Sequence, residues 1–117
     1  MTQDVESIYD EYISKLKQAM PTVDPNFSHR IMYLERKLSG EDMTDPDVSA
    51  VIEYKPGTNV DSKVNGLRTK YSVEVEHADE KNTLHVMGRM KMGKVKEIAS
   101  DRDIAKITGK ADPGYGE

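Results

Sequence analysis

The stretch from residue 82 to residue 108 constrains the fold more than any other part of this 117-residue chain. Its first eight residues alternate apolar and polar side chains, which is typical of a half-buried strand. Val95 and Ile98 then recur at helical spacing, and a turn at residues 100–103 precedes a second apolar strand that begins at Ile104. The stretch therefore predicts a strand, a helix and a strand, in that order.

The residues before this stretch complete a recognisable order of elements. They predict a strand at 48–55, a helix capped by Thr58 or Asn59, and a second strand at 72–77. The full order is then β-α-β-β-α-β. This order is typical of the ferredoxin-like sandwich, an α+β fold in which two helices pack on one antiparallel sheet. We expect a ferredoxin-like domain over residues 48–109.

Two more helices are expected at the N-terminus. Apolar residues recur at helical spacing over residues 3–19, and Pro21 ends that series. Asp24 and Pro25 form a typical helix start before a second series that stops at Gly40. We expect an additional N-terminal α-helical hairpin over residues 1–40, an acidic linker over 41–47, and a flexible C-terminal tail over 110–117.

The composition narrows the classes of function. The net charge of −4 argues against a general binder of nucleic-acid backbones, and the absence of cysteine excludes disulfides and thiolate metal sites. No apolar run is long enough to span a bilayer, so we expect a cytoplasmic protein with no membrane contact. The three histidines fall in different predicted elements, and no catalytic motif is present. We expect neither an enzyme nor a bound cofactor or metal.

Residues 88–94 have the spacing of a phosphate-binding loop as far as its lysine. The hydroxyl residue that should follow, to hold magnesium, is Val95 instead. A basic patch nevertheless lies here, and it could bind RNA; its members are Arg89, Lys91, Lys94 and Lys96. RNA-binding domains stack bases on aromatic residues of the sheet, and the strand at 83–89 has none, so we expect a solvated helix entrance instead.

The alternation along the strands predicts which residues share the sheet face that the helices leave uncovered. Val51 and Met87 give this face some apolar character, whereas its other members are polar. The predicted set is Ser49, Val51, Glu53, Glu74, Glu76, Thr83, His85, Met87 and Arg89. Two interpretations remain open at this point: the face is a docking surface, or the N-terminal hairpin folds back over it.

Residues 48–113 resemble the subtilisin propeptide-like inhibitor family. The matching features are an opening apolar strand that ends in Lys55-Pro56-Gly57, a middle pair of strands, and a closing pattern of helix, aspartate-containing turn and strand. The closing pattern is the most specific, and it reads Val95-x-x-Ile98-Ala99-x-Asp101-x-Asp103-Ile104-Ala105-x-Ile107.

This resemblance implies a non-enzymatic, free-standing inhibitor or chaperone of a subtilisin-type serine protease. Members of the family dock the helix-free sheet face on the protease and lay the C-terminal tail along its substrate cleft. The resemblance thus implies a docking face of Val51, Glu53, Glu74, Glu76, His85 and Met87. It implies a tail of Gly109, Lys110, Ala111, Asp112 and Pro113.

Two alternatives accompany this interpretation. The first is a regulatory or small-ligand ferredoxin-like domain that forms a homodimer through the N-terminal helices. The second is an RNA-binding protein that uses the basic patch. Removal of the tail, removal of the N-terminal helices and reversal of the lysine charges separate the three hypotheses.

Overall fold

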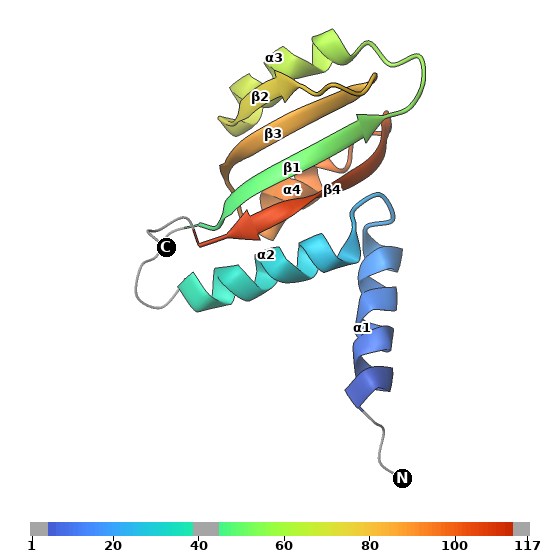
Figure 1. Ribbon diagram of the computed structural model, residues 1–117, viewed down its shortest axis with the longest axis vertical. Coiled ribbons are helices and arrows are strands. Elements are labelled where there is room, and N and C mark those ends of the chain that lie inside the picture. The colour runs from blue at the N-terminus through green and yellow to red at the C-terminus, as the bar shows by residue number, and fades with distance from the viewer. Residues whose placement is uncertain (1–4, 39–44, 114–117) are drawn as a thin grey trace.

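The computed structural model describes residues 5–38 and 45–113. Within these ranges it is a mixed α+β structure with four helices and a four-stranded antiparallel sheet (Figure 1). The helices are α1 (Val5–Ala19), α2 (Pro25–Leu38), α3 (Val60–Tyr71) and α4 (Met92–Ile98). The strands are β1 (Asp47–Tyr54), β2 (Glu74–His77), β3 (Thr83–Arg89) and β4 (Ile104–Asp112). From β1 onwards the elements follow the predicted order.

The sheet has the order β2-β3-β1-β4, so β1 and β3 are central and β2 and β4 are the edges. Along β1, Ala50 lies opposite Val86 of β3 and Gly109 of β4. Every second residue of β1 from Val48 to Tyr54 is buried, whereas the intervening residues are half-buried or exposed. This alternation confirms the predicted assignment of side chains to the two faces of the sheet.

Both ends of the helix α3 are capped by neighbouring residues. Asn59 caps its start, because the Asn59 side chain accepts a hydrogen bond from the backbone N–H of Ser62. At the other end Ser72 takes a left-handed conformation, with φ of 54°, and its N–H donates to the carbonyl of Arg68. The strand β2 therefore starts at Glu74 and not at the predicted residue 72, because Ser72 serves as the helix cap.

One hydrophobic core joins the sheet to α2, α3 and α4. The α2 side chains Phe27, Ile31, Leu34 and Leu38 belong to the same buried cluster as the sheet residues. Just before α2, Val23 forms an isolated parallel bridge with Ile107, which ties this segment to the outer edge of β4. The second predicted helix is thus part of the main core.

The helix α1 projects from the rest of the molecule (Figure 1). It has no buried residue, and it meets α2 at a steep angle near the start of α2. The Cα radius of gyration is 15.4 Å, compared with about 13 Å for a compact domain of this length. The molecule is elongated because α1 extends away from the core.

The predicted flexible tail is wrong for residues 110–112, which form the last part of β4. Asp112 lies opposite Asp47 and Lys110 opposite Ser49. The alternation of the preceding strand continues here, because Ile107, Gly109 and Ala111 occupy the helix-covered side of the sheet. Pro113 of the predicted tail is buried. Residues 114–117 of that tail, 41–44 of the predicted linker, and 1–4 and 39–40 of the predicted hairpin lie outside the described residues.

Candidate docking face

The sheet face away from α2, α3 and α4 is the candidate site, and we call it the open face. Its side chains form rows across the four strands. Glu74, Met87, Ser49 and Lys110 make one row, and Glu76, His85, Val51 and Thr108 make the next. Glu53 and Lys106 lie beyond the second row, and Arg89, Asp47 and Asp112 lie beyond the first. The alternation of strand residues thus brings together side chains from distant parts of the sequence.

The two edge strands of the open face differ in net charge. The edge strand β2 contributes Glu74 and Glu76, both exposed, whereas the opposite edge strand β4 contributes Lys106 and Lys110. Between these edges lie the half-buried side chains of Val51, His85 and Met87. The exposed charges of Asp47, Glu53 and Arg89 also belong to the middle strands, and Asp112 adds one carboxylate to the β4 edge. The open face therefore has an acidic β2 edge, a mixed centre and a β4 edge with two lysines and one aspartate.

The centre of the open face combines apolar contact area with a hydrogen-bonding group. Val51 and Met87 are half-buried, and His85 lies between Val51 and Glu76 in its row. The ring Nε2 of His85 is 3.4 Å from Oγ of Ser49. His85 lies directly opposite Glu76 of β2.

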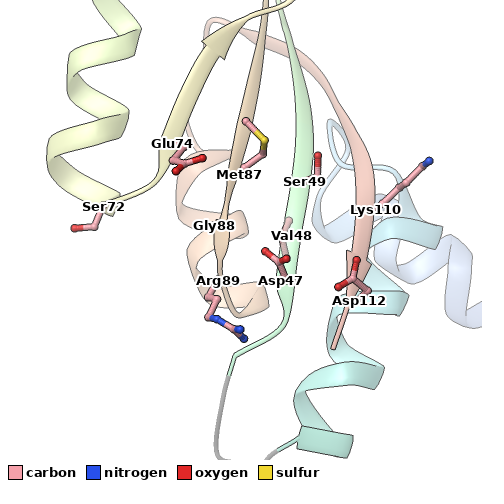
Figure 2. Close-up of a pocket in the computed structure, with 10 residues that line it drawn as sticks. All are labelled: Asp47, Val48, Ser49, Ser72, Glu74, Met87, Gly88, Arg89, Lys110 and Asp112. Atoms are coloured by element: carbon pink, nitrogen blue, oxygen red, sulfur yellow. The ribbon is translucent and has the colours of Figure 1, made fainter. Parts of the chain in front are cut away.

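A shallow hollow of about 620 Å³ occupies one end of the open face. Figure 2 shows Glu74, Met87, Ser49 and Lys110 side by side along it, one from each strand. Arg89, Asp47 and Asp112 close its far end. The guanidinium Nη1 of Arg89 donates to the carbonyl of Asp45 at 3.1 Å, so this arginine also holds the start of β1. The lining is too polar for a typical small-ligand pocket, which is mostly apolar.

The structure brings together some of the residues that were predicted to bind a partner and separates others. The six predicted from the strands all lie on the open face: Val51, Glu53, Glu74, Glu76, His85 and Met87. The five predicted for the tail divide between the two sides of β4. Lys110 and Asp112 are exposed on the open face, whereas Gly109 and Ala111 face the helices and Pro113 is buried.

Lys106 and Thr108 also lie on the open face, although neither is in the predicted set. Simple alternation from Ile104 would put Lys106 on the covered side, but a register shift next to Ile104 turns Lys106 to the open face. Thr108 follows Ile107, where the predicted apolar strand ended because glycine and proline follow. The alternation from Ile107 to Asp112, with small or apolar residues at every second position, was the available indication of a longer strand.

The N-terminal helices do not cover the open face. Phe27 of α2 packs against Gly109 from the helix-covered side of β4, and Glu35 of α2 reaches the start of α4 on that same side. Glu53, Glu74 and Glu76 remain exposed. Of the two interpretations left open by the sequence, folding back of the helices is therefore wrong.

The basic patch is largely engaged within the protein. Nζ of Lys94 donates to the carbonyl of Tyr71 at 3.2 Å, and Lys91 lies 3.9 Å from a carboxylate oxygen of Asp45. At the start of α4, a carboxylate oxygen of Glu35 accepts a hydrogen bond of 2.9 Å from the backbone N–H of Met92. This carboxylate occupies the place where a phosphate-binding loop would hold its anion.

A second cluster of charged groups lies between α3 and β4. Nζ of Lys63 is 2.7 Å from Asp103 and 3.0 Å from Asp101. These hydrogen bonds raise the pKa of Lys63, and the bond to Lys63 lowers the pKa of Asp103. Burial raises the pKa of the neighbouring Tyr54 to about 12. The cluster connects α3 to the turn before β4, and the one lysine is shared by two aspartates.

No helix within residues 5–38 and 45–113 has the length and apolar character needed to cross a membrane. Among those same residues, no group of three or more histidine, aspartate or glutamate side chains is arranged to hold a metal ion. Comparison with known proteins finds no match among family models, curated proteins or solved structures.

Proposed function

We propose that this protein is a non-enzymatic protein-binding module that docks a subtilisin-type serine protease on its open face. One observation carries the proposal. The six strand residues assigned to docking by the resemblance come from three strands, and all lie on the one sheet face that α2, α3 and α4 leave uncovered. Each of the six is exposed or half-buried, as a surface that meets a partner requires.

The chemistry of the open face suits such a partner. Glu53, Glu74 and Glu76 are carboxylates that can meet the positive N-terminal ends of helices on the protease. Met87 and Val51 add apolar area at the centre, where burial contributes most to binding. Charged groups around an apolar centre favour a specific orientation of the partner.

The inserted part of the tail is shorter in this proposal than the resemblance implied. Gly109 to Asp112 pair with β1 and so belong to the docking scaffold. Only residues after Asp112 are left to enter the substrate cleft as an extended segment.

We further propose that residues 47–112 belong to the ferredoxin-like class. The support is the succession β1-α3-β2-β3-α4-β4 together with the sheet order β2-β3-β1-β4. In this arrangement each helix connects two parallel strands between which another strand lies, the split βαβ unit of that class.

Titration of subtilisin with the full-length protein tests the proposed function. We expect inhibition at a stoichiometric amount, followed by slow cleavage of the protein. The double variant Glu74→Lys/Glu76→Lys reverses the acidic edge, and we expect it to weaken inhibition by roughly tenfold or more. The matched control is Glu80→Lys, which changes an exposed charge in the loop after β2. This control should inhibit as the unmodified protein does.

A chain that lacks residues 114–117 separates binding through the open face from insertion of the tail into the substrate cleft. It should still bind subtilisin through the open face but leave the protease active. If the full-length protein is simply digested, the proposed partner is wrong. Equal inhibition by the Glu74→Lys/Glu76→Lys variant would instead exclude the open face as the docking surface.

A further inference from the structure

The helix α1 carries an apolar stripe that the rest of the described chain leaves largely uncovered. Val5, Ile8 and Tyr9 have 81%, 54% and 46% of their surface exposed. The later members of the stripe, Tyr12, Ile13 and Leu16, are half-buried against the start of α2. Together the six residues follow the spacing of one face of a helix. Tyr33, on the outer face of α2, is the other large apolar side chain that is strongly exposed in the described residues.

The contacts that hold α1 in place are few. The Tyr9 hydroxyl donates to the side chain of Asn26 at 3.1 Å, and the Tyr12 hydroxyl lies 3.1 Å from Nδ1 of His29. The Tyr12 and His29 rings meet edge to face, with centroids 5.4 Å apart. A helix of 15 residues is marginally stable in water unless its apolar face is packed. A partner that covers the apolar stripe would therefore stabilise α1.

The charges beside the stripe are arranged to match a second copy of the same helix in the opposite direction. Glu6 is in the first turn of α1 and Lys17 in the last turn. They are eleven residues apart, close to three full turns of about 3.6 residues, so they lie on the same flank. No ion pair within residues 5–38 and 45–113 involves either of them, whereas Lys15 is paired with Glu11 at 3.2 Å.

We propose that the protein forms a homodimer in which α1 pairs antiparallel with α1 of a second copy. This pairing places Val5 near Leu16 of the second copy and Glu6 near Lys17 of the second copy. By symmetry each of these contacts forms twice, and the interface closes so that no larger assembly follows. A parallel pairing would put the two copies of this flank on opposite sides of the interface, so neither Glu6 nor Lys17 would meet an opposite charge there.

The proposed interface is small and does not use the open face. A helix of 15 residues is about 22 Å long, so the area is at the lower end of stable interfaces, and we expect dissociation in the micromolar range. The open face belongs to the sheet, and α1 projects from the start of α2 (Figure 1). Self-association and protease binding are therefore independent, and either can fail without the other.

The dimer is tested by reversing the charges of Glu6 and Lys17 and measuring the dimer dissociation constant of each variant. We expect sedimentation velocity from about 5 to 500 µM to show a monomer–dimer equilibrium for the unmodified protein. Glu6→Lys and Lys17→Glu should each weaken association by roughly tenfold. An equimolar mixture of these two variants restores both opposite-charge contacts, so it should associate about as strongly as the unmodified protein. Glu80→Lys is the control for net charge and should change nothing.

Ile8→Asp provides a second variant that reports on the apolar stripe. Because Ile8 is more than half exposed in the single chain, this change should abolish association and leave the circular dichroism of the monomer nearly unchanged. A monomer at every concentration overturns the proposal. Single reversals without effect exclude the antiparallel pairing. A mixture that stays as weak as its components means that the charges serve only the dipole of their own helix.

Discussion

Gly109 lies where Phe27 of α2 packs against the sheet. A Cβ atom at this position would lie 2.9 Å from Cα of Ala50 and 3.1 Å from Cε1 of Phe27, and closer still to the carbonyl oxygen of Ser49. Two of these three neighbours are backbone atoms, which have little freedom to move. Gly109 is therefore required by packing, whereas the resemblance implied that it begins the inserted tail.

Gly109→Ala should destabilise the protein by roughly 2 kcal/mol or more, because the added methyl group displaces β1 or Phe27. The matched control is Gly66→Ala in α3, where nothing lies within 4 Å of the added atom. That change should stabilise the protein by about 0.5–1 kcal/mol, because alanine favours the helix. Urea unfolding of both variants measures the difference, and a neutral Gly109→Ala would contradict the close packing.

The short helix α4 depends on a side chain from another element for its start. The N-cap residue of α4 is Lys91, and its side chain makes no capping hydrogen bond. Glu35 of α2 supplies the acceptor instead, through the bond from the N–H of Met92. The carboxylate also suits the positive end of the helix dipole. Two helices far apart in the sequence are thereby joined on the covered side of the sheet.

Glu35→Ala should lower the free energy of unfolding by about 1–2 kcal/mol, because it leaves the start of α4 without its acceptor. Glu35→Gln keeps an oxygen acceptor without the charge and should cost less than Glu35→Ala. Lys37→Ala, an exposed change in the same helix, should stay within about 0.5 kcal/mol. If urea midpoints for Glu35→Ala and Lys37→Ala coincide, the capping role is wrong.

At the scale of the whole molecule, the two N-terminal helices have different roles. The four buried apolar side chains of α2 belong to the same core as the sheet, whereas α1 has no buried residue. Loss of even two such side chains would cost about 4–10 kcal/mol. That is comparable with the entire stability of a small domain. The core unit of this protein therefore starts near Val23, which pairs with β4.

Deletion of N-terminal residues tests whether α2 is needed for folding and α1 is not. A chain without residues 1–19 should fold, with a free energy of unfolding lowered by roughly 1 kcal/mol at low protein concentration, because only half-buried contacts are lost. A chain without residues 1–38 should be unfolded, because the helix-covered side of β4 is then exposed. Circular dichroism and thermal unfolding distinguish the two. A folded shorter chain would show that α2 is dispensable.

The sequence by itself determined the order of the elements from β1 onwards and the faces of β1, β2 and β3. Alternation in strands such as residues 83–89 has a period of two, so it predicts which side chains lie together even before the strands are placed. Local capping at Asn59 was equally predictable, because the residues that make it are three positions apart.

Only the tertiary structure decided where α2 packs, how far β4 extends and why Gly109 is a glycine. Each of these depends on contacts between residues distant in the sequence, such as Gly109 with Phe27 and Ser49. The hydrophobic periodicity of α1 and α2 is similar, yet one helix is in the core and the other projects from it. Periodicity shows that a helix has an apolar face, but the partner that covers this face is set by the packing of the whole chain.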